Sequence, residues 1–224
     1  GAAAPARDSH VEAVAALPVP LATTDSVVFA PASPRRLLAV VPFAWSDARS
    51  EGDALPPDMR AARLGVRLAD LEGGAARRDT SAGAAALAVA SLVGQIDGAG
   101  YIAGAYRRLA DSLRDRAAAQ RVTAADVRRA REAVEIAVGP TEDALVQFAA
   151  WAELARFAAA AGDLAFLREP ASRAHLERAT ARFAAGTPAG DAVRRVQRQL
   201  ADGTPDGVIA VRRSLDTLLA AVTR

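Results

Sequence analysis

The stretch from Ala82 to Val93 constrains the fold more than any other part of the chain, because it contains no charged residue. A helix that is apolar on most sides is buried in a protein core or in a membrane. The longer stretch Ala82–Tyr106 could be a membrane span, but it is rich in alanine and glycine and contains Gln95 and Asp97. We therefore expect Ala82–Val93 to be the central helix of a soluble helical domain, with a break after it near Gly98–Gly100.

Apolar residues recur at helical spacing in the segment before this stretch. Leu64, Leu68 and Leu71 stand at i, i+4 and i+7, which places them on one face of a helix that begins after Pro57. Gly73-Gly74 is expected to end this helix, since glycine tolerates the left-handed conformation of a C-cap. The three leucines are expected to pack against the Ala82–Val93 helix.

Helix boundaries are also marked along the rest of the chain. Thr123 and Asp126 have the spacing of a capping box, and Gly139-Pro140 separates two helical segments. Thr187-Pro188 and Thr204-Pro205 each combine an N-cap residue with a proline that suits the first turn of a helix. The pattern predicts an all-α fold, a single-domain bundle of about seven to nine helices.

Residues 1–54 differ from the rest, because prolines interrupt them repeatedly and allow only short helices, at His10–Leu17 and Pro34–Ala44. We expect an irregular segment over 1–54 that packs on a bundle formed by 55–224. The alanine-rich start resembles the leader that follows a removed signal peptide or a lipid-anchored residue. Export, and a lipid anchor upstream, are therefore expected.

Composition excludes several classes of site. The chain has no cysteine, which excludes disulfides, thiolate metal sites and cysteine nucleophiles. It has 28 arginines, no lysine and 26 acidic residues. The densest arginine region, around Arg128 and Arg131, suggests nucleic-acid binding as one alternative. Interspersed carboxylates such as Glu132 and the scarcity of aromatic residues there favour a solvated helix face instead.

Five residues are candidates for a ligand-binding site. Asp97 is a carboxylate in an apolar segment, so it must find a donor, and Tyr101 follows one helical turn later. Trp151 belongs to an aromatic stripe on a later helix, where Gln147 and Glu153 could supply polar contacts to a ligand. The alternative interpretations are structural: Asp97 caps a helix or pairs with an arginine, and the stripe packs in the core.

No metal site, cofactor or catalytic motif is expected. The chain has two histidines, lacks a His-Glu-x-x-His motif, and has neither a phosphate-binding glycine loop nor a serine in a triad context. His175 and Glu177 stand at i and i+2, which point apart on a helix. A hydrolytic enzyme that uses helical carboxylates around Asp97 remains an alternative.

Three short segments resemble a group of uncharacterised, exported bacterial all-helical proteins, which are predicted lipoproteins of unknown function. The segments are Leu17–Pro20 (LPVP), Arg63–Leu71 (RLGVRLADL) and Ala150–Leu154 (AWAEL). Their order and spacing fit that group over about residues 17–165.

The resemblance implies an all-helical exported domain and no particular activity, with Asp70, Trp151 and Glu153 as matching positions. We therefore expect a non-catalytic extracytoplasmic helical domain, which is a binding or interaction module for a small or lipid-like ligand or for a protein partner. Its expected location is the periplasm, or a membrane anchor facing the periplasm, and the alternative is the cytoplasm.

Overall fold

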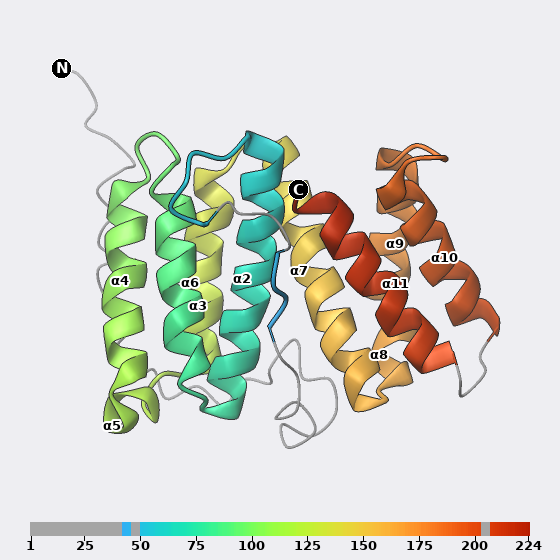
Figure 1. Cartoon of the computed structure of the whole chain (residues 1–224). Coiled ribbons are helices and arrows are strands. Elements are labelled where there is room, and N and C mark those ends of the chain that lie inside the picture. The colour runs from blue at the N-terminus through green and yellow to red at the C-terminus, as the bar shows by residue number, and fades with distance from the viewer. Residues whose placement is uncertain (1–41, 46–49, 203–206) are drawn as a thin grey trace.

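The computed structural model describes residues 42–45, 50–202 and 207–224, which form ten helices and no strand (Figure 1). Eight of the ten have seven or more residues, so the predicted all-α bundle is confirmed. The helices are α2 (Pro57–Arg77), α3 (Ser81–Val93), α4 (Gly100–Arg114), α5 (Arg116–Ala119), α6 (Ala124–Ala137), α7 (Pro140–Ala161), α8 (Leu164–Arg168), α9 (Pro170–Arg182), α10 (Pro188–Asp202) and α11 (Gly207–Val222).

Most of the expected N-terminal segment lies outside the described residues, as do the predicted helix His10–Leu17 and the Thr204-Pro205 boundary. The described end of the predicted helix Pro34–Ala44, residues 42–44, is not helical. The division of the chain at residue 54 stays a prediction.

Helices α2 and α7 form the axis of the molecule and separate α3, α4 and α6 from α9, α10 and α11 (Figure 1). They approach closely at Gly65, where an added Cβ would lie 2.9 Å from the backbone nitrogen of Ala150 and would overlap the carbonyl oxygen of Val146. Glycine is required there because any side chain would push the two backbones apart. On the other side of α7, α11 packs along it.

The expectation that Ala82–Val93 is the central helix is wrong. Helix α3 packs between α2 and α4, and its outer side is open to solvent, with Leu87 39% exposed. Trp151 of α7 donates a hydrogen bond to Ser172 of α9, on the side of the molecule away from α3 (Figure 1). The middle of α2, residues 61–74, is almost entirely buried although it carries charges, because its arginines bond to carboxylates and carbonyl oxygens.

The expectation that Gly73-Gly74 ends α2 is also wrong. The helix continues to Arg77, and Arg78 takes the left-handed C-cap conformation at φ 55°. Gly74 serves packing instead: an added Cβ would lie 2.9 Å from the backbone nitrogen of Ala82, at the start of α3.

Other boundaries agree with the sequence pattern. The break after α3 covers residues 94–99, with Gly98 at φ 78°, and it divides the stretch that could have been a membrane span. Thr123 and Asp126 form the predicted capping box of α6, and Thr187 accepts a hydrogen bond from the backbone of Gly190 at the start of α10. In the described part of the chain, the helices fall short of the length and apolar character needed to cross a bilayer.

Candidate functional site

A cleft of about 330 Å³ lies between the first half of α7 and the second half of α9. Side chains spaced three and four residues apart share one face of a helix, so each helix presents one row to the cleft. The lining residues are Asp143, Ala144, Gln147 and Phe148 from α7, and His175, Arg178, Ala179 and Arg182 from α9.

His175 is held in place by the aromatic core behind the cleft. Its ring stacks on Trp151, with centroids 5.7 Å apart and planes 13° from parallel. The indole Nε1 of Trp151 donates to Ser172 Oγ at 3.0 Å, and Ser172 donates in turn to the carbonyl oxygen of Phe166 at 2.8 Å. These bonds fix the orientation of the tryptophan, and the stack then fixes the imidazole.

The imidazole of His175 is neutral near pH 7. Burial, and then the charge of Arg178, lower the pKa of His175 to about 4. Arg178 Nη2 lies 3.3 Å from Nδ1 of the imidazole, so Nδ1 is the acceptor and Nε2 carries the hydrogen. His175 therefore offers a hydrogen bond, and no charge, to anything that enters the cleft.

Two guanidinium groups give the cleft its positive character. Arg178 is exposed at the mouth, and Arg182 lies 3.8 Å from Asp58, a carboxylate that is 75% exposed to solvent. The one carboxylate that lines the cleft, Asp143, accepts a hydrogen bond from Gln147 at 2.8 Å. Burial, and then the charge of Glu135, raise the pKa of Asp143.

A larger, mostly apolar groove of about 970 Å³ adjoins the cleft, and Arg182 lines both. The rings of Phe183 in the groove and Phe148 in the cleft are 5.7 Å apart. The groove runs between α9, α10 and α11, and its apolar lining consists of Met59, Leu145, Phe183, Ala184, Pro188, Ala189, Ala220, Ala221 and Val222. Two carboxylates, Asp58 and Asp216, and two arginines, Arg182 and Arg224, also line the groove.

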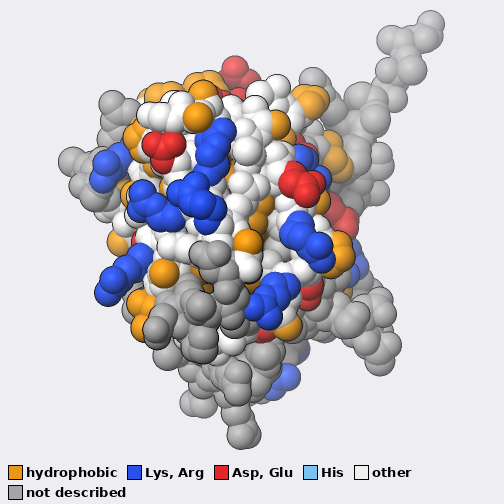
Figure 2. Space-filling model, turned by 90° about the vertical axis from the view of Figure 1, so that its right-hand side faces the viewer, with side chains coloured by type: hydrophobic (Ala, Val, Ile, Leu, Met, Phe, Trp, Pro, Cys, Tyr) orange, Lys and Arg blue, Asp and Glu red, His pale blue; other side chains and the backbone are white. Residues whose placement is uncertain are grey.

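The surface beside this site is rich in arginine. Residues 164–224 contain ten arginines and six acidic residues, whereas the whole chain has 28 and 26. Figure 2 shows several arginine side chains close together on the face that α9, α10 and α11 form. A positive surface next to a cavity raises the local concentration of anions.

Of the predicted site residues, Gln147 and Trp151 lie at this site. Gln147 lines the cleft, and Trp151 is buried behind His175. Glu153 is also on α7, but its carboxylate points to another face of the helix, where it bonds to Arg156 and to the backbone nitrogen of Phe43.

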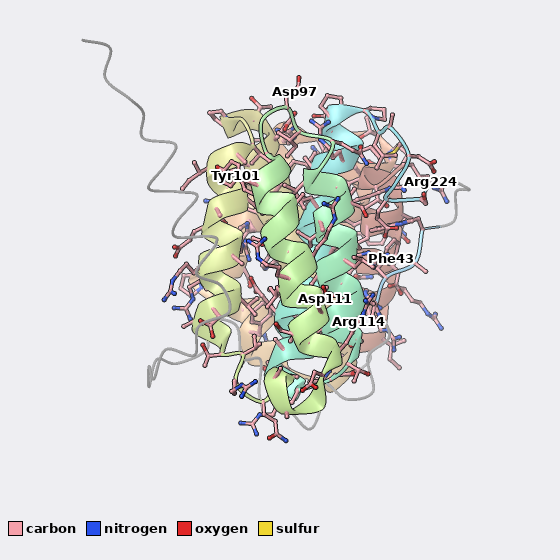
Figure 3. The ribbon with its side chains drawn as sticks, turned by 90° about the vertical axis from the view of Figure 1, so that its left-hand side faces the viewer. Phe43, Asp97, Tyr101, Asp111, Arg114 and Arg224 are labelled. Carbon is pink, nitrogen blue, oxygen red and sulfur yellow. The ribbon has the colours of Figure 1, made fainter. Side chains whose placement is uncertain are left out.

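Asp97 and Tyr101 lie elsewhere, on the α3–α4 side of the molecule (Figure 3). Asp97 is exposed in the loop between these helices, and Tyr101 is 36% exposed in the first turn of α4. The N-cap residue of α4 is Ala99, so the expectation that Asp97 caps this helix is wrong. The structure does not bring Asp97 or Tyr101 together with the α7 residues.

Sequence reasoning missed the α9 side of the cleft. His175, Arg178 and Arg182 stand at i, i+3 and i+7, a signal for one shared helix face that was present in the sequence. Nothing local showed that this face meets α7. Among the described residues, no group of three or more histidines and carboxylates is placed to hold a metal ion.

No protein-family model, curated protein or solved structure matches the chain. Its function therefore has to be inferred from the residues of the cleft and the groove.

Proposed function

We propose that the protein is a non-catalytic extracytoplasmic binding module, and that its ligand is a small amphipathic anion. The single observation that supports this most is the junction of the α7–α9 cleft, with its two arginines, and the apolar groove. Their volumes, about 330 and 970 Å³, fall in the usual range for small-molecule sites.

The anionic group of the ligand lies in the cleft. Arg178 and Arg182 can each donate two hydrogen bonds from a planar guanidinium to a carboxylate or phosphate. Gln147 and the Nε2 hydrogen of His175 provide further polar contacts, and neither adds a negative charge. Phe148 forms an apolar wall beside them.

The apolar part of the ligand lies in the groove beyond Arg182. Leu145, Phe183 and Val222 are among the side chains that it would cover. Each methylene group removed from water there contributes about 0.8 kcal/mol, so a chain of several carbons supplies most of the binding free energy. The arginines then select for a charged end group.

Binding without catalysis fits the chemistry of the cleft. A general acid or base works best when its pKa is near the working pH, whereas the pKa of His175 is about 4. The eight described residues that line the cleft include no serine, threonine or cysteine, the usual nucleophiles.

The extracytoplasmic location is supported by the resemblance of three segments to exported helical proteins. Fractionation of cells that produce the protein natively tests this part. Recovery from the periplasm or from a membrane fraction facing it is expected, and recovery with cytoplasmic proteins would contradict it.

Calorimetric titration with decanoate, below its micelle concentration, tests the ligand class, and decanol, below its solubility limit, serves as the uncharged counterpart. We expect decanoate to bind at least about tenfold more tightly than decanol, because a hydrogen bond to a charged group contributes about 1.5–3 kcal/mol. Arg178→Ala should reduce this preference, because only Arg182 then remains to bind the charged group. Arg195→Ala, which removes an exposed arginine of α10 outside both cavities, should leave it unchanged. Equal binding of the two probes, or equal effects of the two substitutions, would refute the proposal.

A further inference from the structure

A second set of polar groups, separate from the cleft, is buried between α2 and α7 beneath the segment Pro42–Trp45. Glu153 is fully buried, and Arg156 donates to both of its carboxylate oxygens, at 2.7 Å from Nε and 2.6 Å from Nη2. The backbone nitrogen of Phe43 donates to Oε1 of the same carboxylate at 3.1 Å. One end of the segment is thereby bonded to a buried charge.

Helix α2 holds the same segment through Arg67. Its Nη1 donates to the carbonyl oxygen of Phe43 at 3.0 Å and to Oδ2 of Asp70 at 2.8 Å. Its Nε and Nη2 lie 2.9 and 2.8 Å from Glu51 Oε1. The ring of Trp45 lies against this guanidinium, whose carbon is 4.2 Å from the ring centroid. The segment thus docks mainly on charged side chains.

The Asp70 and Glu153 carboxyls are both connected to Phe43, since Arg67 bridges Asp70 to its carbonyl oxygen and Glu153 accepts from its nitrogen. Two ionised carboxylates offer only acceptors and repel each other, so two buried carboxyls near each other are stabilised when one carries a proton. Glu153 already accepts three N–H bonds, whereas Oδ1 of Asp70 accepts none from the described residues. The proton therefore resides on Asp70, which is 3% exposed.

We infer that the Asp70–Glu153 pair is a proton-binding site whose occupancy is linked to the docking of Pro42–Trp45. The bond that breaks is the O–H of Asp70, and its proton passes to solvent. A cavity of about 320 Å³, lined by Pro42 and Asp70 among others, gives the proton its route. After the proton leaves, two adjacent carboxylates repel each other, and the segment must move away before water can solvate both.

The direction of the pH dependence follows from this linkage. Burial, and then the charge of Glu153, raise the pKa of Asp70 well above its ordinary value. When the segment leaves, Asp70 becomes hydrated and its pKa falls. The docked state therefore binds more protons than the open state between the two pKa values, so docking is favoured at low pH and weakens as pH rises through the raised pKa.

Other charged groups also surround the pair. They are Arg63 and Arg67 of α2, Glu51 before α2, Arg156 of α7, and Asp216 of α11, which lies 3.8 Å from Arg156. The arginines stay charged. Burial alone would raise the pKa of Glu51, but hydrogen bonds and the charge of Arg67 lower it overall, so this carboxylate is already ionised.

Fluorescence of Trp45 in the full chain tests the inference, with Trp151→Phe removing the other tryptophan. We expect emission to shift to the red as pH rises, with a midpoint above about 3.9, the ordinary pKa of aspartate, while circular dichroism shows intact helices. Asp70→Asn should abolish the shift, because an asparagine amide has no titratable proton. Asp97→Asn, in the exposed α3–α4 loop, is the matched control and should retain the shift in Trp45 emission.

Infrared spectroscopy of the same Trp151→Phe chain provides a second test, which holds even if Asp70→Asn does not fold. A carbonyl band of a protonated carboxyl should be present while the segment is docked and should disappear with the midpoint of the fluorescence change. Absence of the band in the docked state, or a different midpoint, would overturn the inference. So would an unchanged fluorescence titration in folded Asp70→Asn.

Discussion

Replacement of Gly65 by alanine tests the close crossing of α2 and α7. The added Cβ would overlap the carbonyl oxygen of Val146 and lie 2.9 Å from the nitrogen of Ala150. Both atoms belong to the backbone of a buried helix, so neither can move aside as a side chain could. Overpacking of this kind costs about 1–3 kcal/mol, and a backbone obstacle places the cost near the upper end.

The net effect of Gly65→Ala is smaller than this cost, because alanine is the better helix former by about 0.8–1.0 kcal/mol. We expect a net loss of about 2 kcal/mol in the free energy of unfolding, since about 3 kcal/mol of overpacking is offset in part. For a chain of this size each kcal/mol shifts Tm by about 2–4 °C, so Tm should fall by about 4–8 °C.

Gly104→Ala is the matched control, and urea unfolding of both variants is the assay. At Gly104 of α4 the nearest atom to an added Cβ is the end of the Arg108 side chain, 3.7 Å away, which is ordinary contact. This substitution should therefore raise the free energy of unfolding by about 0.5–1 kcal/mol. If Gly65→Ala also stabilised the protein, the close crossing of α2 and α7 would be refuted.

Three further predictions concern stability. Thr123→Ala removes the capping box with Asp126 and should cost about 1 kcal/mol in urea unfolding; no change would show that the cap contributes nothing. Arg156→Met leaves the buried Glu153 without its main partner and should cost about 3–5 kcal/mol, and a loss below 1 kcal/mol by the same assay would contradict the pairing. The pKa of His175 is about 4 in the folded protein and higher in the unfolded state, so the unfolded state binds more protons and the free energy of unfolding falls from pH 6.5 toward pH 4. In urea unfolding measured across that range, His175→Gln should make this fall less steep. An equal slope in the variant would refute the lowered pKa of His175.

Local features of the sequence predicted most helix boundaries. The Thr123–Asp126 box, Pro140 and Thr187-Pro188 act within one helical turn, so their effect does not depend on the rest of the fold. Glycine was ambiguous, because it can end a helix or permit close packing. At Gly74 packing prevailed, and the expected end of α2 was wrong.

The burial of α2 could not be predicted from its charge pattern. The Arg67 side chain is only 15% exposed because it bonds to Glu51 and to the carbonyl oxygen of Phe43, which are distant in sequence. The candidate site was predicted only in part, because it also depends on contacts between residues that are distant in sequence. Gln147 and Trp151 share α7, whereas the α9 side chains join them only through helix packing.

A crystal structure with decanoate at a saturating concentration tests the proposed ligand site most directly. The carboxylate is predicted to lie within hydrogen-bonding distance of Arg178 or Arg182, with the hydrocarbon chain in the groove against Leu145 and Val222. Density for decanoate at another place, with the cleft between α7 and α9 empty, would contradict the account.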